Sequence, residues 1–312
     1  MNEIQKTAII LVTYGQWEKT RNCLDDLFKQ PLERFQVFVV DNGSPDETPR
    51  NIAQEFPSVK LFCPGKNLGF GAANNLGIAY AEKSGIPFDS ILVLNNDVRV
   101  PPGTLEALQQ DLSQFSGHII SPQLRNADGS IQKSWFSNIP PWQFFLNAFR
   151  TKESAARYVH GKISPVKDSP ILEAQWTNAA AWLMTFKTWK QVGSFDENFF
   201  MYYEDVDWAY RARIFGIRFF IDPRISIIHL DGGSAQNILS RSLQHDSSQL
   251  YFYRKHLGFK GALLSRIFRM SRSLVRIILL LPKVFFSKEA RKNAQIHLVL
   301  FLFSLGLFKF KR

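Results

Sequence analysis

The chain has 312 residues, of which 45% are hydrophobic and 21% charged, enough for one large domain with an appendage or for two modest domains. The net charge of +11 would suit a nucleic-acid binder, but it is unevenly placed. Residues 254–312 hold 14 of the 38 Lys and Arg residues and one of the 27 acids, which leaves 24 basic and 26 acidic residues elsewhere. A nearly neutral body argues against a globular nucleic-acid reader with a basic face.

The cysteine content and the N-terminal segment indicate the compartment. Cys23 and Cys63 show no metal-ligand spacing and form no disulfide framework, which is typical of a reducing environment. The first apolar run is too short for a secretory signal peptide. We therefore expect a cytoplasmic protein.

The first hundred residues alternate between strand-like and helix-like segments. Apolar runs rich in β-branched residues predict four strands, at residues 7–14, 35–41, 59–63 and 90–97. Helical segments lie between them, the clearest at residues 17–30. Continuous apolar strands separated by helices predict an α/β fold with a parallel sheet covered on both faces. In such sheets ligands bind beyond the carboxyl ends of the strands.

Polar groups follow these strands at the edge where a ligand is expected. They are Thr13-Tyr14-Gly15, Asp41-Asn42-Gly43-Ser44, Lys66-Asn67-Leu68-Gly69 and Asn95-Asn96-Asp97. Each segment alone can be an ordinary turn, but four at one edge favour a binding site. No GxGxxG motif follows the first strand, so the dinucleotide fingerprint is absent.

The middle of the chain is less regular. The segment "NADGS" predicts a hairpin or turn at residues 126–130, and residues 137–170 are expected to form a mobile loop region. A helix is predicted over "EDVDWAYRARIFG", ended by Gly216. Two short strands are predicted around Pro223, the second ending at His229.

Three acids begin that helix, in the stretch "FFMYYEDVDW". Negative charge is favourable at a helix N-terminus, which could explain all three. Asp207 precedes Arg211 by four residues, the spacing of an ordinary helical ion pair. Glu204 and Asp205 have no cation three or four residues ahead. Unpaired acids beside Trp and Tyr are candidates for a raised pKa and for general-base catalysis.

Six segments in this order resemble glycosyltransferase family 2, the inverting nucleotide-sugar transferases of the GT-A fold, and in particular its rhamnosyltransferase-like branch. They are "LVTYG", "VVDNGSPD", "NLGFGAANN", "LNNDV", "VGSFDENFFMYYEDVDWAYRARIFG" and "HLDGGS". The resemblance implies a Rossmann-like, mostly parallel sheet flanked by helices. We expect this GT-A domain at residues 1–239 and a basic helical extension at residues 240–312.

The resemblance implies a donor site at the strand ends. Asp41 would accept the imide N–H of uracil or thymine, although an Asx-turn or helix cap is an alternative for this residue. Lys66 would contact phosphate. The implied nucleotide-sugar-binding residues are Thr13, Tyr14, Gly15, Asp41, Asn42, Gly43, Lys66, Asn67, Gly69, Asn75, Asn95 and Asn96.

The family's metal-binding strand end, usually DxD, corresponds to "NND" in this sequence. The resemblance implies Mg²⁺ or Mn²⁺ bound through Asp97, with His229 completing the metal shell. Asn95 stands in the first acidic position, which lowers the ligand charge and should weaken metal binding before the donor arrives. The alternative for His229 is a histidine at the edge of the core that is hydrogen-bonded to backbone.

The resemblance assigns general-base catalysis to the second acid of "ED", which is Asp205. Glu204 would support it or orient the acceptor, and Trp176 is a candidate for stacking on the acceptor sugar. The implied reaction is a single displacement with inversion of the anomeric carbon. The acceptor would be a glycan or a lipid-linked sugar in bacterial surface polysaccharide synthesis.

The donor implied by the branch is dTDP-L-rhamnose, with a UDP-hexose or UDP-galactofuranose as the alternative. Two other kinds of protein are alternatives. A nucleotidyltransferase would normally carry a phosphate loop rich in Gly, Arg and Lys after the first strand, and "TYGQWEKT" does not resemble one. A non-catalytic nucleotide-sugar-binding scaffold would not need the retained "ED", "NND" and His229 set.

The basic tail has amphipathic character. Apolar residues recur at helical spacing between residues 263 and 281, with Arg269, Arg272 and Arg276 on another face. The apolar run at residues 296–308 is shorter than the roughly 18 residues of a spanning helix. We expect an anchor on the anionic inner face of the bacterial cell membrane. The alternatives are a helical homodimer interface and a cap on the main domain.

Overall fold

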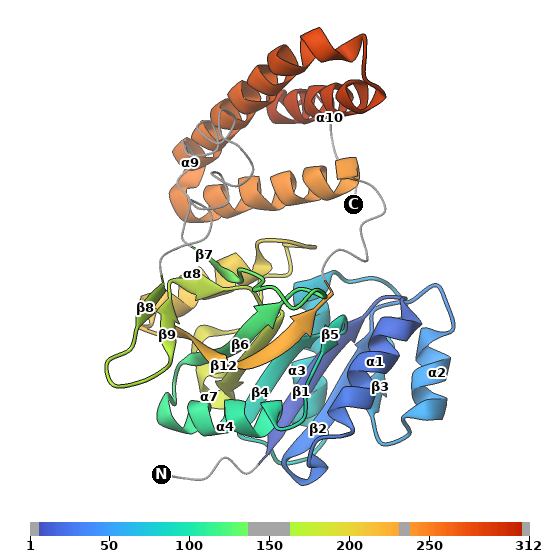
Figure 1. Ribbon diagram of the computed structural model, residues 1–312, viewed down its shortest axis with the longest axis vertical. Helices are drawn as coiled ribbons and strands as arrows, with labels where there is room; N and C mark the ends of the chain where they lie inside the picture. The colour runs from blue at the N-terminus through green and yellow to red at the C-terminus, as the bar shows by residue number, and fades with distance from the viewer. Residues whose placement is uncertain (1–5, 137–162, 231–237, 308–312) are drawn as a thin grey trace. The chain divides into compact units, whose positions relative to one another are not determined.

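The computed structural model describes residues 6–136, 163–230 and 238–307 (Figure 1). These separate into two compact units. The first consists of residues 6–136, 163–200 and 204–230, and the second of residues 201–203 and 238–307. Most of the expected loop region, the residues after Leu230 in "HLDGGS" and the last three basic residues lie outside the described ranges.

One side of the ten-stranded main sheet in the first unit consists of four parallel strands. Their order is β3 (Lys60–Phe62), β2 (Phe35–Asp41), β1 (Thr7–Thr13) and β4 (Ser90–Asn95). These are the four strands predicted from the apolar runs. The register places Thr13 beside Asp41. The predicted parallel arrangement, with polar residues collected at one edge, is therefore confirmed.

The rest of the sheet is mixed. β11 (Ala181–Thr185) runs antiparallel to β4 and is followed by β6, β12, β9 and β8. Of these, only β6 and β12 are parallel neighbours. β5 pairs with the end of β12, and a separate ribbon joins β7 to β10. The bounds are β5 (Val98–Arg99), β6 (Ile119–Arg125), β7 (Trp135–Phe136), β8 (Ile163–Pro165), β9 (Leu172–Ala174), β10 (Trp176–Thr177) and β12 (Phe219–His229).

Two predictions for this region are wrong. β12 is one strand, not two, because its register against β6 shifts between Asp222 and Ser226 and the irregularity accommodates Pro223. The backbone N–H of Arg224 donates to Asp222 Oδ1 at 2.8 Å within this bulge. Residues 163–165 were expected in a loop, but they form β8, which pairs with β9.

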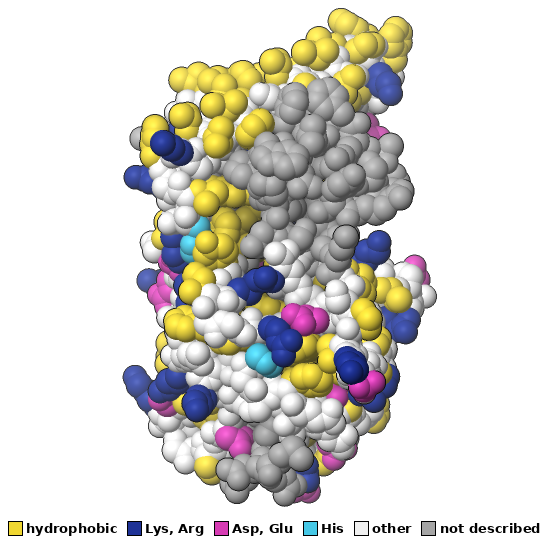
Figure 2. Space-filling model, turned by 90° about the vertical axis from the view of Figure 1, so that its left-hand side faces the viewer, with side chains coloured by type: hydrophobic (Ala, Val, Ile, Leu, Met, Phe, Trp, Pro, Cys, Tyr) yellow, Lys and Arg dark blue, Asp and Glu magenta, His cyan; other side chains and the backbone are white. Residues whose placement is uncertain are grey.

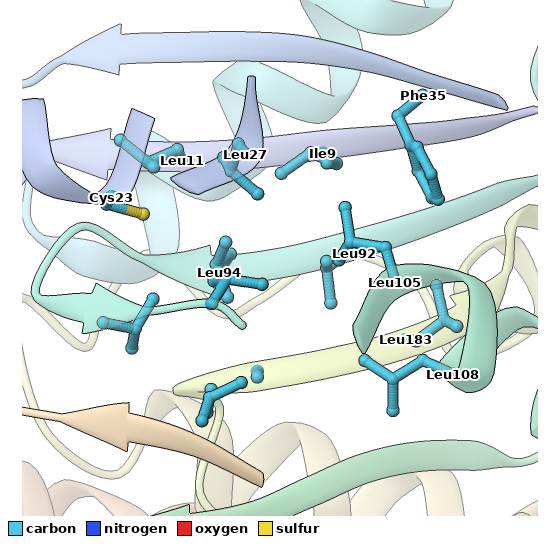
Figure 3. Close-up of a cluster of buried hydrophobic side chains, with 14 of the residues drawn as sticks. Ile9, Leu11, Cys23, Leu27, Phe35, Leu92, Leu94, Leu105, Leu108 and Leu183 are labelled. Atoms are coloured by element: carbon cyan, nitrogen blue, oxygen red, sulfur yellow. The ribbon is translucent and has the colours of Figure 1, made fainter. Parts of the chain in front are cut away.

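Helices cover both faces of the sheet, as Figure 1 shows. One face packs against α1, α2 and α4, and its buried side chains include Ile9, Leu92 and Leu94 from the strands (Figure 3). The other face packs against α3, α7 and α8. The helix bounds are α1 (Trp17–Leu27), η1 (Leu32–Arg34), α2 (Thr48–Glu55), α3 (Phe70–Lys83), α4 (Thr104–Gln114), α7 (Phe186–Val192) and α8 (Glu204–Ile214).

The second unit is helical. α9 (Ile238–Val284) is interrupted at Gly258, whose φ of 64° is not helical. α10 (Lys288–Leu305) packs on α9 and is capped by Ser287, whose hydroxyl accepts from the N–H of Ala290 at 3.2 Å. The predicted amphipathic helix at residues 263–281 lies inside α9. Within the described ranges, no helix has the length and apolar character needed to cross a membrane.

Candidate functional site

The ends of β1 and β2 are joined by Ser44. Its backbone N–H donates to Asp41 Oδ1 at 3.1 Å, its hydroxyl donates to Asp41 Oδ2, and the N–H of Gly15 donates to that hydroxyl at 2.6 Å. The Asx-turn considered for Asp41 is therefore present. A carboxylate has lone pairs beyond these two bonds, so an Asx-turn does not prevent Asp41 from binding a base. Tyr14, at the same edge, is 45% exposed.

Asn42 and Asn67 shape the loop that leads into α3. Asn42 Oδ1 accepts from the N–H of Leu68 at 2.8 Å, and Asn42 Nδ2 donates to Asn67 Oδ1 at 3.1 Å. Asn67 Oδ1 also accepts from the N–H of Gly69 at 2.9 Å. These two side chains hold the loop, so a donor would meet mainly its backbone.

The tip of this loop lies against the turn after β2. A Cβ atom on Gly43 would lie 2.7 Å from the carbonyl carbon of Lys66, so only glycine allows this approach. The Lys66 side chain is exposed. The structure thus places the loop beside the Asp41 turn and leaves an ammonium group available at the edge of the sheet.

Two predicted donor-binding amides are used in packing. Asn96 Nδ2 donates to the hydroxyls of Thr13 and Thr20, at 3.2 and 2.9 Å. Asn75 Nδ2 donates to the carbonyl of Phe195 at 2.9 Å, and Asn75 Oδ1 accepts from the Phe195 N–H at the same distance. Asn96 therefore ties β4 to β1 and α1, and Asn75 holds the turn that precedes α8.

The ends of β4 and β12 bring Asn95, Asp97 and His229 together. His229 Nε2 lies 3.3 Å from Asp97 Oδ1 and 3.2 Å from Asn95 Nδ2. On its other side, His229 Nδ1 lies 2.8 Å from Gln132 Oε1. Burial would raise the pKa of Asp97, but the hydrogen bond and charge of His229, with the charge of Lys19, hold it below its ordinary value.

This constellation fits a divalent cation. An amide oxygen can only accept, so Nδ1 of His229 carries a proton and Nε2 faces the Asp97 carboxylate. Asn95 Oδ1 is buried and has no hydrogen-bond partner. The described ranges contain no cluster of three His, Cys, Asp or Glu side chains suited to a metal, but Mg²⁺ and Mn²⁺ often take their remaining ligands from substrate phosphates.

The three acids of α8 lie in three environments. Glu204 is 6% exposed, its Oε2 has no hydrogen-bond partner, and burial followed by the charge of Asp205 raises its pKa well above the ordinary value. Asp205 is half-buried, and its Oδ1 accepts from the N–H of Val206 at 2.8 Å. Asp207 is fully buried and accepts from Arg211 Nε at 2.9 Å, which confirms the predicted ion pair.

Trp176 does not present a free face. Its side chain is buried, and its ring stacks on Phe136 with centroids 4.6 Å apart and planes 25° apart. The ring is therefore part of the core on the α8 side of the sheet. Stacking on an acceptor sugar, as expected from the sequence, would require this contact to open.

Comparison with known families decides the class of protein. The family model described as "Glycosyl transferase family 2" matches residues 8–169, slightly more than half of the chain. The chain belongs to glycosyl transferase family 2. The predicted family is thereby confirmed, and the protein is a glycosyltransferase.

Two curated relatives are rhamnosyltransferases. The glycosyltransferase is 28% identical to the N-acetylglucosaminyl-diphospho-decaprenol L-rhamnosyltransferase of Mycobacterium tuberculosis, over 86% of this chain and 94% of the relative. It is 26% identical to the dTDP-rhamnosyl transferase RfbF of Shigella flexneri, over 80% of this chain and 77% of the relative. These similarities support the rhamnosyltransferase-like branch.

A solved structure confirms the GT-A fold. The mannosyltransferase PcManGT from Pyrobaculum calidifontis, in complex with GDP-Man and Mn²⁺, superimposes with a TM-score of 0.56. The alignment covers 97% of this chain and 86% of the other at 14% identity. At that identity the similarity concerns the fold alone.

Two residues of this glycosyltransferase site were given no individual role by sequence reasoning. Ser44 bridges the ends of β1 and β2, and Gln132 holds the ring of His229. Ser44 was named among the polar residues that follow the second strand, but its bonds to Asp41 and Gly15 depend on the paired ends of β1 and β2. Gln132 lies in an unremarkable segment after the turn at residues 126–130, and only the fold brings it to His229.

Proposed function

We propose that this glycosyltransferase moves a sugar from a nucleoside diphosphate donor to a hydroxyl acceptor with inversion, and that Asp205 is the general base. The observation that carries the proposal is the contrast at the start of α8. Asp205 is half-buried, whereas its neighbour Glu204 is buried and favours the neutral form. A neutral Glu204 leaves the negative charge of the pair on Asp205, where a proton can be accepted.

The reaction would proceed in one displacement. Asp205 takes the proton of the acceptor hydroxyl as that oxygen forms a bond to the anomeric carbon. The bond from this carbon to the diphosphate oxygen breaks on the opposite face, and nucleoside diphosphate leaves. Asp97 and His229, with Asn95, would hold a divalent ion, which when bound offsets the charge of the diphosphate. Asp41 and the loop at residues 66–69 would bind the nucleotide and the sugar.

We propose dTDP-L-rhamnose as the donor and a lipid-linked sugar as the acceptor. The donor proposal is supported by two relatives whose names specify rhamnosyl transfer. The acceptor proposal is supported by the name of the mycobacterial relative, which specifies a diphospho-decaprenol carrier. Such a carrier would place the enzyme at the cytoplasmic face of the cell membrane. The second unit supports this location because α9 and α10 expose many large apolar side chains.

Donor screening tests the proposal. The full chain is incubated with dTDP-L-rhamnose, UDP-glucose or UDP-galactofuranose, each with Mn²⁺, Mg²⁺ or chelator, and nucleoside diphosphate release is measured. We expect release from dTDP-L-rhamnose that depends on the metal. Preference for a UDP-sugar would show that the proposed donor is wrong and that the protein is still a glycosyltransferase. Release of pyrophosphate would indicate a nucleotidyltransferase, and no release from any donor would favour a binding scaffold.

Substitution of the base gives the sharpest test of mechanism. We expect Asp205→Asn to lower kcat by roughly 10²- to 10⁴-fold, the usual contribution of a general base. Nucleoside diphosphate affinity, measured by calorimetry, should stay within about twofold. The matched control is Glu204→Gln, which mimics the protonated neighbour and should keep most of kcat. Equal losses in the two variants, or near-normal turnover in Asp205→Asn, would show that the assignment is wrong.

A further inference from the structure

The backbone immediately before the proposed base has an unusual conformation. Tyr202 and Tyr203 have φ values of 66° and 69°, in the left-handed region that residues other than glycine rarely adopt. Each such residue costs roughly 1–2 kcal/mol. Two in succession persist only where surrounding contacts hold them, and such strain concentrates at functional sites.

The contacts that hold these residues come from α9. The carbonyl of Met201 accepts from Ser248 Oγ at 2.7 Å and from Gln244 Nε2 at 3.4 Å. Gln249 Nε2 donates to the hydroxyl of Tyr203. Residues 201–203 belong to the same compact unit as α9, although they lie between two segments of the other unit.

Aromatic packing adds to these bonds. The Tyr203 ring lies 5.5 Å from the Phe252 ring and 5.3 Å from the His245 ring. The Tyr202 ring lies 5.9 Å from the same histidine. Tyr203 is thus fixed by rings as well as by a hydrogen bond, and Tyr202 contacts a ring. These partners all lie within the first arm of α9, before Gly258.

Two of the α9 side chains that make these bonds are almost fully buried. Ser248 and Gln249 are each 1% exposed. Burying a polar group without a hydrogen bond costs roughly 1–3 kcal/mol, so these residues are tolerated because residues 201–203 satisfy them. An apolar helix face could not make these hydrogen bonds to the strained run at residues 201–203, which indicates a specific role for the two polar side chains.

We propose that Ser248 and Gln249 are positioning residues for Asp205. They hold the run of residues 201–203, in which Tyr202 and Tyr203 are left-handed, and this run sets the direction in which the chain enters α8. Tyr203 is joined by one peptide bond to Glu204, and Asp205 follows. On the other side of the run, the carbonyl of Phe200 accepts from the N–H of Phe70 at 3.0 Å, so both ends are held. The proposal rests on the proposed role of Asp205.

Kinetics of full-length variants test it. Ser248→Ala and Gln249→Leu are compared with wild type for kcat, acceptor KM, nucleoside diphosphate affinity and thermal midpoint. We expect kcat to fall about tenfold while nucleoside diphosphate affinity stays within about twofold. Ser248→Thr retains a hydroxyl donor and should recover most of the loss. Ser247→Ala, which changes the adjacent half-buried serine, is the matched control and should behave as wild type.

A double-mutant cycle keeps the test independent of folding. Tyr203→Phe removes the hydroxyl that Gln249 contacts, so Tyr203→Phe and Gln249→Leu should be non-additive in kcat. Normal kcat in Ser248→Ala and Gln249→Leu, or additive losses in the cycle, would overturn the proposal, as would donor affinity falling in parallel with kcat. Activity in Asp205→Asn would instead overturn the proposed base, so the two failures can be distinguished.

Discussion

At the scale of single residues, Glu204 carries the clearest prediction. Burial and the charge of Asp205 raise its pKa well above the ordinary 4.5. Between the unfolded and folded pKa values the folded state keeps a proton that the unfolded state has lost, so stability falls as pH rises through that window. Glu204→Gln removes this loss. We expect the variant to match wild type near pH 4 and to be more stable at pH 8, by roughly 1–3 kcal/mol. Thermal midpoints across this pH range measure the difference.

The control for Glu204 lies on the same helix. Asp207 is fully buried, and Arg211, its partner, also donates to the carbonyls of Val192 and Ser194, both at 2.7 Å. Asp207→Asn should therefore lose roughly 3–5 kcal/mol, the usual effect of breaking a buried pair. Both substitutions replace a carboxyl group by a carboxamide, but we expect opposite effects on stability at pH 8. A loss of stability at pH 8 in Glu204→Gln would mean that its carboxylate is ionised and bonded in the folded state.

The sequence predicted part of this difference among the acids. Helical spacing exposed the partner of Asp207, because residues four apart meet on one face of a helix. It could not separate Glu204 from Asp205, since their burial depends on a helix more than a hundred residues earlier. A Cβ atom on Gly71 of α3 would lie 3.4 Å from Glu204 Cβ. The contact of Gln132 with His229 could not be predicted either, because the two residues are far apart in the sequence.

At the scale of elements, the start of α3 depends on Gly69. Its φ is 84°, and an added Cβ would lie 2.1 Å from the carbonyl oxygen of Phe200. Gly69→Ala must therefore displace either α3 or the run before α8. We expect a loss of roughly 2 kcal/mol or more in denaturant unfolding, from backbone strain and from the lost bond between Phe70 and Phe200. Nucleoside diphosphate binding should weaken as well, because the loop at residues 66–69 shifts.

Gly65 supplies the matched control for Gly69. It has a similar φ of 78°, but no atom lies within 4 Å of an added Cβ. Gly65→Ala should therefore show only the conformational cost of roughly 1–2 kcal/mol and should keep nucleotide affinity. If the two alanine variants behave alike, the close approach of Gly69 to Phe200 does not matter for the site.

Strands were predictable where local pattern and tertiary context agreed. The runs at β1, β2 and β4 are mostly apolar because both faces of a parallel sheet are buried. Two strands were predicted in place of β12 because a proline usually ends a strand. Only the shifted pairing of β12 with β6 shows how Pro223 is accommodated. β8 has three residues, two of them exposed, so no apolar pattern marked it.

At the scale of the whole molecule, the second unit exposes apolar surface to an unusual degree. Figure 2 shows hydrophobic side chains gathered over the helices of this unit. The most exposed are at the turn between α9 and α10, where Phe285 and Phe286 are 83% and 91% exposed. Four exposed cations surround this turn with one acid, Glu289; the cations are Lys283, Lys288, Arg291 and Lys292. Aromatic tips flanked by cations suit an anionic bilayer surface, where apolar burial and electrostatic attraction add.

The membrane proposal therefore predicts a specific loss. Phe285→Ser combined with Phe286→Ser should reduce flotation of the full chain with vesicles containing phosphatidylglycerol by roughly tenfold or more, since each buried Phe contributes roughly 1.5–3 kcal/mol. Neutral phosphatidylcholine vesicles and high salt should weaken binding of wild type, because the surrounding cations then lose their attraction. Ile214→Ser, at an apolar residue 71% exposed at the end of α8, is the control and should float as wild type. Unchanged flotation in the double variant, together with a shift from dimer to monomer in light scattering, would instead assign this surface to a homodimer.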